Sequence, residues 1–166
     1  HSGCQILSWF ELRGPMMVII EPGNPKDTEV RALLSKSHAL MEQLFSPENS
    51  FALSIDDLCT PQIQFFVARE YDVILGCGAL AVKAGYGEIK SMFTEPFARG
   101  QGVGAKILKR IELEARVVNL PILRLETGDA LKSAVGLYRR LGFKTCGPFG
   151  DYTENGVSVF MEKPLG

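Results

Sequence analysis

Apolar and polar positions follow two periods along this chain, one typical of helices and one typical of strands. Apolar residues recur every three or four positions in the segments predicted to form amphipathic helices, which are 27–45, 102–118 and 130–141. Short apolar runs bounded by turn residues predict strands, which are 17–21, 62–70, 73–83, 88–94, 122–127, 143–146 and 157–163. The polar segment 46–61 connects the first helix to the second strand and has room for a further short helix.

This order of elements predicts an α+β fold with a mixed, mostly antiparallel sheet and helices on both faces. The three strands between 62 and 94 follow one another through short turns, which favours an antiparallel meander. With 166 residues, 46% of them hydrophobic, the chain is large enough for one domain with a buried core. We assign this domain to 16–166. Residues 1–15 do not share the pattern, and we interpret them as a leader or a segment left by cloning.

Charge and cysteine content narrow the classes of partner. The net charge is −1 and the basic residues are dispersed, so we expect neither a nucleic-acid nor a membrane partner. The four cysteines lie far apart and the chain has two histidines, so we expect neither a disulfide framework nor a metal site. These features favour a cytoplasmic protein. His38 lies beside the apolar stripe of the first helix, where we expect a partly buried structural residue.

A glycine-rich stretch stands at the start of the 102–118 helix. The run Arg99-Gly100-Gln101-Gly102-Val103-Gly104 places three glycines in five positions directly before the apolar helical pattern. A helix start offers unpaired N–H groups and the positive end of the helix dipole, which together favour phosphate binding. The spacing differs from G-x-G-x-x-G and from the P-loop, but it matches [QR]-x-x-G-x-[GA]. A glycine-rich helix start without a ligand is the alternative at this point.

This run resembles the turn of the GNAT superfamily of N-acetyltransferases that holds the pyrophosphate of acetyl-coenzyme A. The order of the predicted elements is also the GNAT order. The resemblance implies a fold in which the fourth and fifth strands splay apart and the coenzyme arm lies along the fourth strand. It implies acetyl-CoA as the co-substrate. It also implies a set of coenzyme-binding residues, namely Met92, Phe93, Thr94, Arg99, Gly100, Gln101, Gly102, Val103, Gly104 and Ala105.

Two further residues match positions that have a catalytic role in that family. The segment 134–143 resembles the GNAT signature A-x-x-L-Y-x-x-x-G-F, whose tyrosine lies near the coenzyme sulfur, so the resemblance implies Tyr138 as general acid. Glu88 precedes Arg99 by eleven positions, the separation at which some GNAT branches carry a general-base glutamate. The alternatives are that Tyr138 is a core aromatic residue and that Glu88 is a surface residue paired with Lys90.

The acceptor is the least constrained part of the prediction. In the GNAT fold, the segments corresponding to 46–57 and 147–155 wall the acceptor site. The candidate substrate-binding residues are therefore Glu48, Phe51, Lys90, Asp151 and Tyr152. Acidic and aromatic side chains suit a cationic amine, whereas a lysine suits a substrate carboxylate.

We therefore predict transfer of an acetyl group from acetyl-CoA to a primary amine of a small molecule. The amine attacks directly, with Glu88 as a water-mediated base and Tyr138 as the general acid. Nearly all of 17–163 resembles bacterial single-domain acetyltransferases of this superfamily, many relatives of which dimerise, so a homodimer is consistent with the resemblance. Two alternatives stay open: a non-catalytic acyl-CoA sensor, and an enzyme that acetylates a protein lysine or N-terminus.

Overall fold

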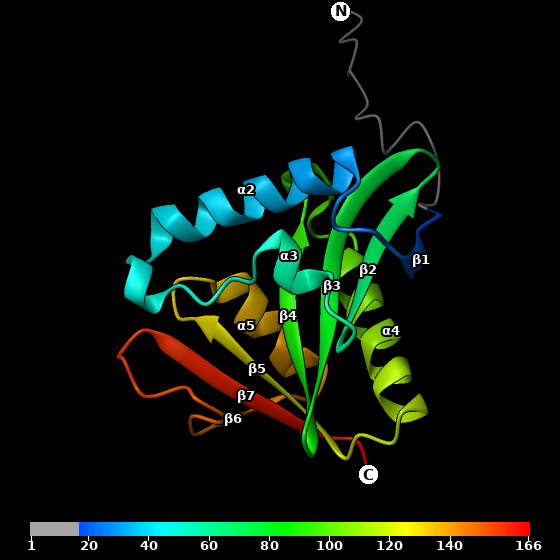
Figure 1. The fold of residues 1–166 in the computed structure, drawn as a ribbon. Helices are drawn as coiled ribbons and strands as arrows, with labels where there is room; N and C mark the ends of the chain where they lie inside the picture. The colour runs from blue at the N-terminus through cyan, green and yellow to red at the C-terminus, as the bar shows by residue number, and fades with distance from the viewer. Residues whose placement is uncertain (1–16) are drawn as a thin grey trace, which may run out of the picture.

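A computed structural model describes residues 17–166 as a seven-stranded sheet covered by helices (Figure 1). The strands, in chain order, are β1 (Ile19–Pro22), β2 (Ile63–Glu70), β3 (Val73–Lys83), β4 (Tyr86–Thr94), β5 (Ile122–Gly128), β6 (Lys144–Cys146) and β7 (Ser158–Pro164). The helices are α2 (Thr28–Leu44), α3 (Ile55–Leu58), α4 (Val103–Val117) and α5 (Lys132–Arg140), with the 3-10 helices η1 (Pro47–Asn49) and η2 (Pro96–Ala98). The segment interpreted as a leader, 1–15, lies outside the described residues.

The strand order across the sheet is β1-β2-β3-β4-β5-β7-β6. Every neighbouring pair is antiparallel except β4 and β5, which run parallel. This arrangement confirms both the predicted meander from β2 to β4 and the mixed, mostly antiparallel sheet. The parallel pair follows from α4, which returns the chain across the sheet before β5 begins.

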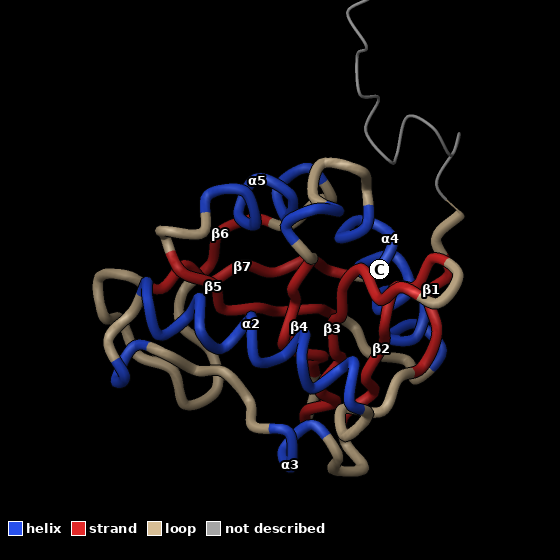
Figure 2. The backbone as a smooth tube through the Cα atoms, turned by 90° about the horizontal axis from the view of Figure 1, so that it is seen from above, coloured by secondary structure: helices blue, strands red, loops and turns tan. Residues whose placement is uncertain are grey.

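The helices divide between the two faces of the sheet, with α2 and α3 on one side and α4 and α5 on the other (Figure 2). Each side buries its own apolar cluster because side chains alternate between the faces of a strand. The α2 side contains Val30, Leu33, Leu34, Leu58, Phe65, Val67 and Phe93. The α4 and α5 side contains Leu75, Leu80, Ile107, Ile111, Leu125, Tyr138 and Met161. The central strand β3 contributes to both clusters, which explains its nearly continuous apolar sequence.

Strands β4 and β5 separate after a short paired stretch. Only 87–89 of β4 pairs with 123–125 of β5. Just beyond this stretch β4 bulges, because Gly78 of β3 stands opposite both Ser91 and Met92, and Ser91 has a left-handed φ of 56°. A Cβ on Gly78 would lie 2.5 Å from the Met92 sulfur, so the Met92 side chain packs directly against the Gly78 backbone. The bulge and the short pairing together confirm the expected splayed pair.

Element boundaries differ from the predictions by one or two residues at several places. Helix α5 begins at Lys132 and not near 130, because the Asp129 N–H bonds the Val157 carbonyl at 2.8 Å and holds the intervening residues in a turn. Strand β4 begins at Tyr86, two residues before the predicted start. The segment 46–61 contains η1 and the single-turn helix α3, which starts with a capping box between Ser54 and Asp57. No helix in the described part of the chain is long and apolar enough to cross a membrane.

Candidate active site

A cavity of about 1060 Å³ passes through the sheet at the point where β4 and β5 separate. Its walls include Leu34 and Met41 from α2 on one side of the sheet, and Gly104 and Leu137 from α4 and α5 on the other. Since helices on opposite faces line one continuous space, the split in the sheet creates the cavity. A molecule that enters from the α4 side therefore reaches groups on the α2 side.

The α4 side of the cavity is formed by the glycine-rich turn. Gly100 and Gly102 have φ values of 76° and 82°, and a Cβ on either would find no atom within 4 Å. These two positions therefore need glycine for their left-handed backbone, and the space above them is open to a ligand. Gly104 is different, because a Cβ added at this position would lie 2.9 Å from a methyl carbon of Leu137. The absence of a side chain here therefore lets α4 pack closely against α5.

The start of α4 presents its backbone N–H groups to this space. The Lys106 N–H bonds the Gly102 carbonyl at 3.1 Å, so the N–H groups that precede it in the first turn are left for an anion. Arg99 joins the turn to β4, since its Nε donates to the Thr94 carbonyl at 3.1 Å and its guanidinium lies 5.5 Å from the centre of the Phe93 ring. All the predicted coenzyme-binding residues line the cavity except Gln101, whose side-chain amide donates to the Phe97 carbonyl. The open turn and the unpaired edge of β4 fit a pyrophosphate and an extended arm.

Tyr138 reaches the cavity from α5. Its side chain is 5% exposed and packs edge-to-face on Phe143, with ring centres 5.8 Å apart. Burial raises the pKa of the Tyr138 hydroxyl, and the nearby Glu126 carboxylate raises this pKa further. The hydroxyl therefore stays protonated at neutral and moderately alkaline pH and is available as a proton donor.

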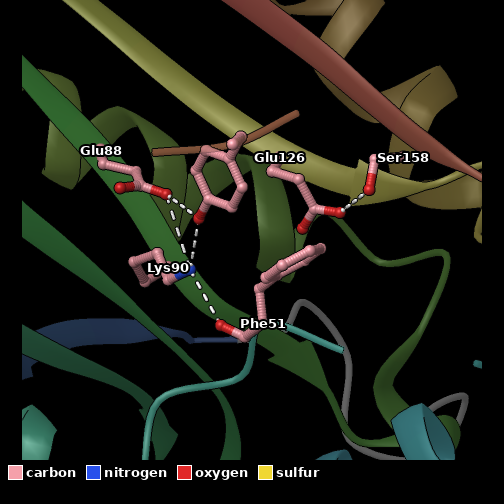
Figure 3. Close-up of polar contacts among 6 residues, drawn as sticks. Phe51, Glu88, Lys90, Glu126 and Ser158 are labelled. Atoms are coloured by element: carbon pink, nitrogen blue, oxygen red, sulfur yellow. Dashed lines mark hydrogen bonds and ion pairs between the residues drawn. The ribbon is translucent and has the colours of Figure 1, made fainter. Parts of the chain in front are cut away.

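Glu88 is buried beneath the cavity wall. Its Oε2 accepts a hydrogen bond of 2.5 Å from the Tyr152 hydroxyl and lies 3.5 Å from Lys90 Nζ (Figure 3). Lys90 Nζ also donates to the Tyr152 hydroxyl at 2.9 Å and to the Phe51 carbonyl at 3.0 Å. Glu88 does pair with Lys90, as the alternative interpretation expected, but at 5% exposure it is not a surface residue. Over 17–166, the cavity walls include Lys90 and Phe51 but neither Glu88 nor Tyr152.

Aromatic packing fixes the loop that carries Tyr152. The Tyr152 ring lies 5.1 Å from the rings of both Phe51 and Phe149, and 5.6 Å from that of Phe160. Burial and the hydrogen bond to Glu88 raise the pKa of the Tyr152 hydroxyl. This hydroxyl therefore remains a proton donor to Glu88 on β4, while the contact between the Tyr152 and Phe51 rings joins the same loop to the 46–57 segment.

The expected acidic wall is not found in the described residues. Glu48 lies on η1 and Asp151 on the loop before β7, where both side chains are exposed to solvent and outside the cavity walls. The same two segments turn other residues inward, since Asn49, Ser50 and Phe51 line the cavity. Surface loops commonly carry acidic residues, and sequence position alone did not show which way these side chains point.

Glu126 is the cavity carboxylate that the sequence-based prediction missed. It lies on β5, is partly exposed to the cavity, and its Oε2 accepts a hydrogen bond of 2.6 Å from the Ser158 hydroxyl (Figure 3). Burial raises the pKa of Glu126 above its ordinary value of 4.5 and Glu88 adds to the rise, whereas Ser158 and Lys90 lower it. The sequence did offer one sign of this residue. Glu126 is the one acidic residue of the strand, and it stands near the strand's end, directly after the buried residues Leu123 and Leu125.

Side chains from α2 complete the cavity walls and were also missed as site residues. Phe45, just after α2, packs so closely on β5 that a Cβ on Gly128 would lie 2.0 Å from its ring. His38 lies on the cavity wall as well, partly buried, with its Nε2 3.2 Å from the Leu53 carbonyl, which confirms the expected environment of this histidine. In residues 17–166 no group of three His, Cys, Asp or Glu side chains is placed to hold a metal ion.

Comparison with known proteins agrees with this geometry. The family model for the acetyltransferase (GNAT) domain matches residues 61–145. The chain belongs to the GNAT family. It is 41% identical to the IAA acetyltransferase of Azospirillum brasilense over 150 residues, which cover 89% of this chain and 98% of that protein. This GNAT protein is thus an acetyl-CoA-dependent N-acetyltransferase.

Solved structures of GNAT proteins share the fold. A proposed acyl-CoA N-acyltransferase from Klebsiella pneumoniae matches with a TM-score of 0.76 and 34% identity, over 90% of this chain and 99% of that one. A proposed acetyltransferase from Salmonella typhimurium, solved with its cofactor acetyl-CoA, matches with a TM-score of 0.69 and 17% identity, over 90% and 94% of the two chains. Because its sequence identity is only 17%, the Salmonella match is evidence for the fold alone.

Proposed function

We propose that this GNAT enzyme transfers the acetyl group of acetyl-CoA to a primary amine of a small molecule by direct attack. The observation that carries the proposal is the single cavity, which joins the glycine-rich turn on one side of the sheet to the α2 wall on the other. Donor and acceptor therefore have room to meet in the gap between β4 and β5. Holding both reactants in one orientation removes most of the entropic barrier to their reaction.

The donor half has the features that acetyl-CoA requires. The N–H groups at the start of α4 and the side chain of Arg99 suit the pyrophosphate, and the free edge of β4 from Met92 to Thr94 suits the pantetheine arm. The Salmonella structure, solved with acetyl-CoA, is an example of this fold with the coenzyme bound. In our proposal an N–H near Met92 or Phe93 polarises the thioester carbonyl as an oxyanion donor.

Two proton transfers accompany the attack. The amine must lose a proton to a carboxylate, and the departing thiolate must gain one. Tyr138 is our proposed acid, because its raised pKa keeps the hydroxyl protonated beside the gap. For the base, the sequence suggests Glu88 acting through water. Its Oε2 is covered by Lys90 and Tyr152, so a proton that reaches this oxygen from the cavity must pass through this pair.

The acceptor half favours an amine with an apolar body. Leu34, Met41, Phe45 and Phe51 provide apolar surface, and Glu126 provides a negative charge for an ammonium group. Lys90 is paired with Glu88 and fully engaged with Tyr152 and the Phe51 carbonyl, so it contributes little net charge to the cavity. This combination supports a small primary amine more than a free carboxylate.

A panel of acceptors tests the proposal. Alkylamines, arylalkylamines, amino acids, a peptide N-terminus and IAA, the compound in the name of the Azospirillum relative, are incubated with acetyl-CoA, and free thiol and acetylated product are measured. We expect turnover on small amines with an apolar body. Coenzyme binding without turnover on any acceptor would favour the acyl-CoA sensor, and turnover on the peptide alone would favour protein acetylation.

A further inference from the structure

Two carboxylates lie near the gap, one on each of the parallel strands that separate there. Glu88 is within the paired stretch, opposite Arg124. If the β4–β5 register continued by one residue beyond Ile89 and Leu125, Lys90 would stand opposite Glu126, so these two residues flank the apex of the gap. Glu126 is therefore one step further into the open part of the gap than Glu88.

The two carboxylates differ in their access to a molecule in the cavity. The Glu88 side chain is 6% exposed, and its Oε2 is covered by the Tyr152 hydroxyl and by Lys90 Nζ. Lys90 lines the cavity in front of it. An amine in the cavity would therefore meet the Lys90 side chain before it met Glu88.

Glu126 faces the cavity directly. Its Oε2 is held by the Ser158 hydroxyl at 2.6 Å, while its second oxygen points toward Phe51, on the side where Lys90 lies (Figure 3). Tyr138 lines the same cavity and lies close enough for the Glu126 charge to raise the pKa of its hydroxyl. An oriented carboxylate and a protonated tyrosine thus share the apex of the gap.

We propose that Glu126 accepts the proton of the acceptor amine, and that Glu88 is a positioning residue that holds Lys90 and Tyr152 in the cavity wall. This inference rests on the proposed acetyl transfer. The amine nitrogen bonds to the acetyl carbon, and its proton passes to the free oxygen of Glu126. The carbon–sulfur bond breaks, the sulfur keeps the electron pair, and Tyr138 gives it a proton. Glu126 then releases its proton to solvent and Tyr138 regains one, so the balance is an amide and a free thiol.

The groups around Glu126 determine how activity depends on pH. Glu88 and Lys90 approach from β4, Ser158 from β7, Tyr138 from α5 and His38 from the α2 wall of the same cavity. Burial and Glu88 raise the pKa of Glu126, while Ser158 and Lys90 lower it. Because the net shift is upward, the deprotonated form needed to accept a proton is lost at a higher pH than for an exposed glutamate. The kcat should therefore fall on the acidic side of neutrality.

Three variants test whether Glu126 is the base. For each, kcat is measured as a function of pH on the best acceptor of the amine panel, and the fall of kcat at acidic pH is called the acidic limb. Glu126→Gln keeps the size of the side chain and the hydrogen bond from Ser158, and should lower kcat by about 100-fold or more with loss of the limb. Ser158→Ala should stay active but move the limb to higher pH, because a bond that lowers the pKa is removed. Glu88→Gln should move the limb to lower pH and raise the acceptor KM more than it lowers kcat.

Coenzyme A binding, measured by calorimetry, verifies that each variant is folded. Unchanged kcat and an unchanged limb in folded Glu126→Gln would overturn the assignment. Loss of the limb in Glu88→Gln instead would identify Glu88 as the base. Wild-type enzyme that turns over no amine in the panel would overturn the proposed function itself, which is a different result from turnover that survives in Glu126→Gln.

Discussion

The two halves of the cavity present different parts of the chain to their proposed ligands. The donor half is made mainly of backbone from one continuous stretch, namely the bulged end of β4, the glycine-rich turn and the first turn of α4. The acceptor half is made of side chains from five separate places: α2, the 46–57 segment, β4, β5 and β7. Backbone recognition depends on local sequence, whereas the acceptor half exists only after the whole sheet has assembled.

This contrast explains why substitutions should act differently in the two halves. In the donor half, a single residue with a Cβ changes the backbone conformation that presents the N–H groups. In the acceptor half, polar side chains are joined in a network around Lys90 and Tyr152, so a substitution there changes both stability and the shape of the wall.

The largest effect should come from Gly102→Glu in the donor turn. The left-handed φ of 82° costs a side chain about 1–2 kcal/mol, and the added carboxylate repels the pyrophosphate, so coenzyme A affinity should fall by more than about 100-fold. Calorimetry measures the affinity. Gly85→Glu is the matched control, because Gly85 has a φ of 83° with no atom within 4 Å of its Cβ and lies on the β3–β4 turn. Equal losses in both variants would show that backbone strain alone is responsible.

Tyr138→Phe should have the next largest effect, on chemistry and not on binding. Removal of the hydroxyl takes away the proposed acid, and the single-turnover rate of thiol release should fall by about 100-fold. Coenzyme A affinity should stay close to that of the wild type, because the ring keeps its contact with Phe143. Tyr71→Phe serves as control, since Tyr71 is 72% exposed on the β2–β3 turn. An unchanged rate would remove Tyr138 from the mechanism.

Tyr152→Phe should affect the stability of the acceptor half. The buried Glu88 carboxylate loses its 2.5 Å hydrogen bond, and the free energy of unfolding should fall by about 1–3 kcal/mol. Urea unfolding measures this value, and the acceptor KM should rise while coenzyme A affinity is retained. If stability and acceptor KM both matched those of Tyr71→Phe, the network would have no structural role.

The smallest effect should come from Lys36→Ala, which breaks a contact between the two halves. Lys36 on α2 donates to Glu95, just before η2, at 2.9 Å and 3.1 Å. The lysine side chain is 57% exposed, so the loss should be about 1 kcal/mol or less in unfolding free energy. A double-mutant cycle with Glu95→Gln isolates the pair. A coupling energy indistinguishable from zero would show that this ion pair does not join the halves.

The sequence predicted the donor half better than the acceptor half for a physical reason. The turn at Arg99–Gly104 is formed by consecutive residues, and the conformations of its glycines follow from local backbone sterics. The alternating pattern of the strands likewise gave the sheet order from β2 to β4, since short turns leave few alternatives.

The acceptor half depends on contacts between distant residues, which a local pattern does not determine. Glu126 and Ser158 are 32 positions apart and meet only because β7 inserts beside β5. Glu48 and Asp151 were expected on the wall because their segments flank the site, but the turn at η1 and the loop before β7 direct both side chains to solvent. Which members of a loop point inward is decided by tertiary packing, here by the aromatic cluster around Tyr152.

In the proposed reaction, donor and acceptor occupy the two halves of one cavity at the same time, so that the amine attacks the thioester directly. Initial velocities measured over a grid of acetyl-CoA and amine concentrations test it most directly. Double-reciprocal plots should give intersecting lines, and enzyme incubated with acetyl-CoA alone should carry no acetyl group by mass spectrometry. Parallel lines together with an isolable acetyl-enzyme would contradict direct attack and show that the acetyl group passes through the enzyme.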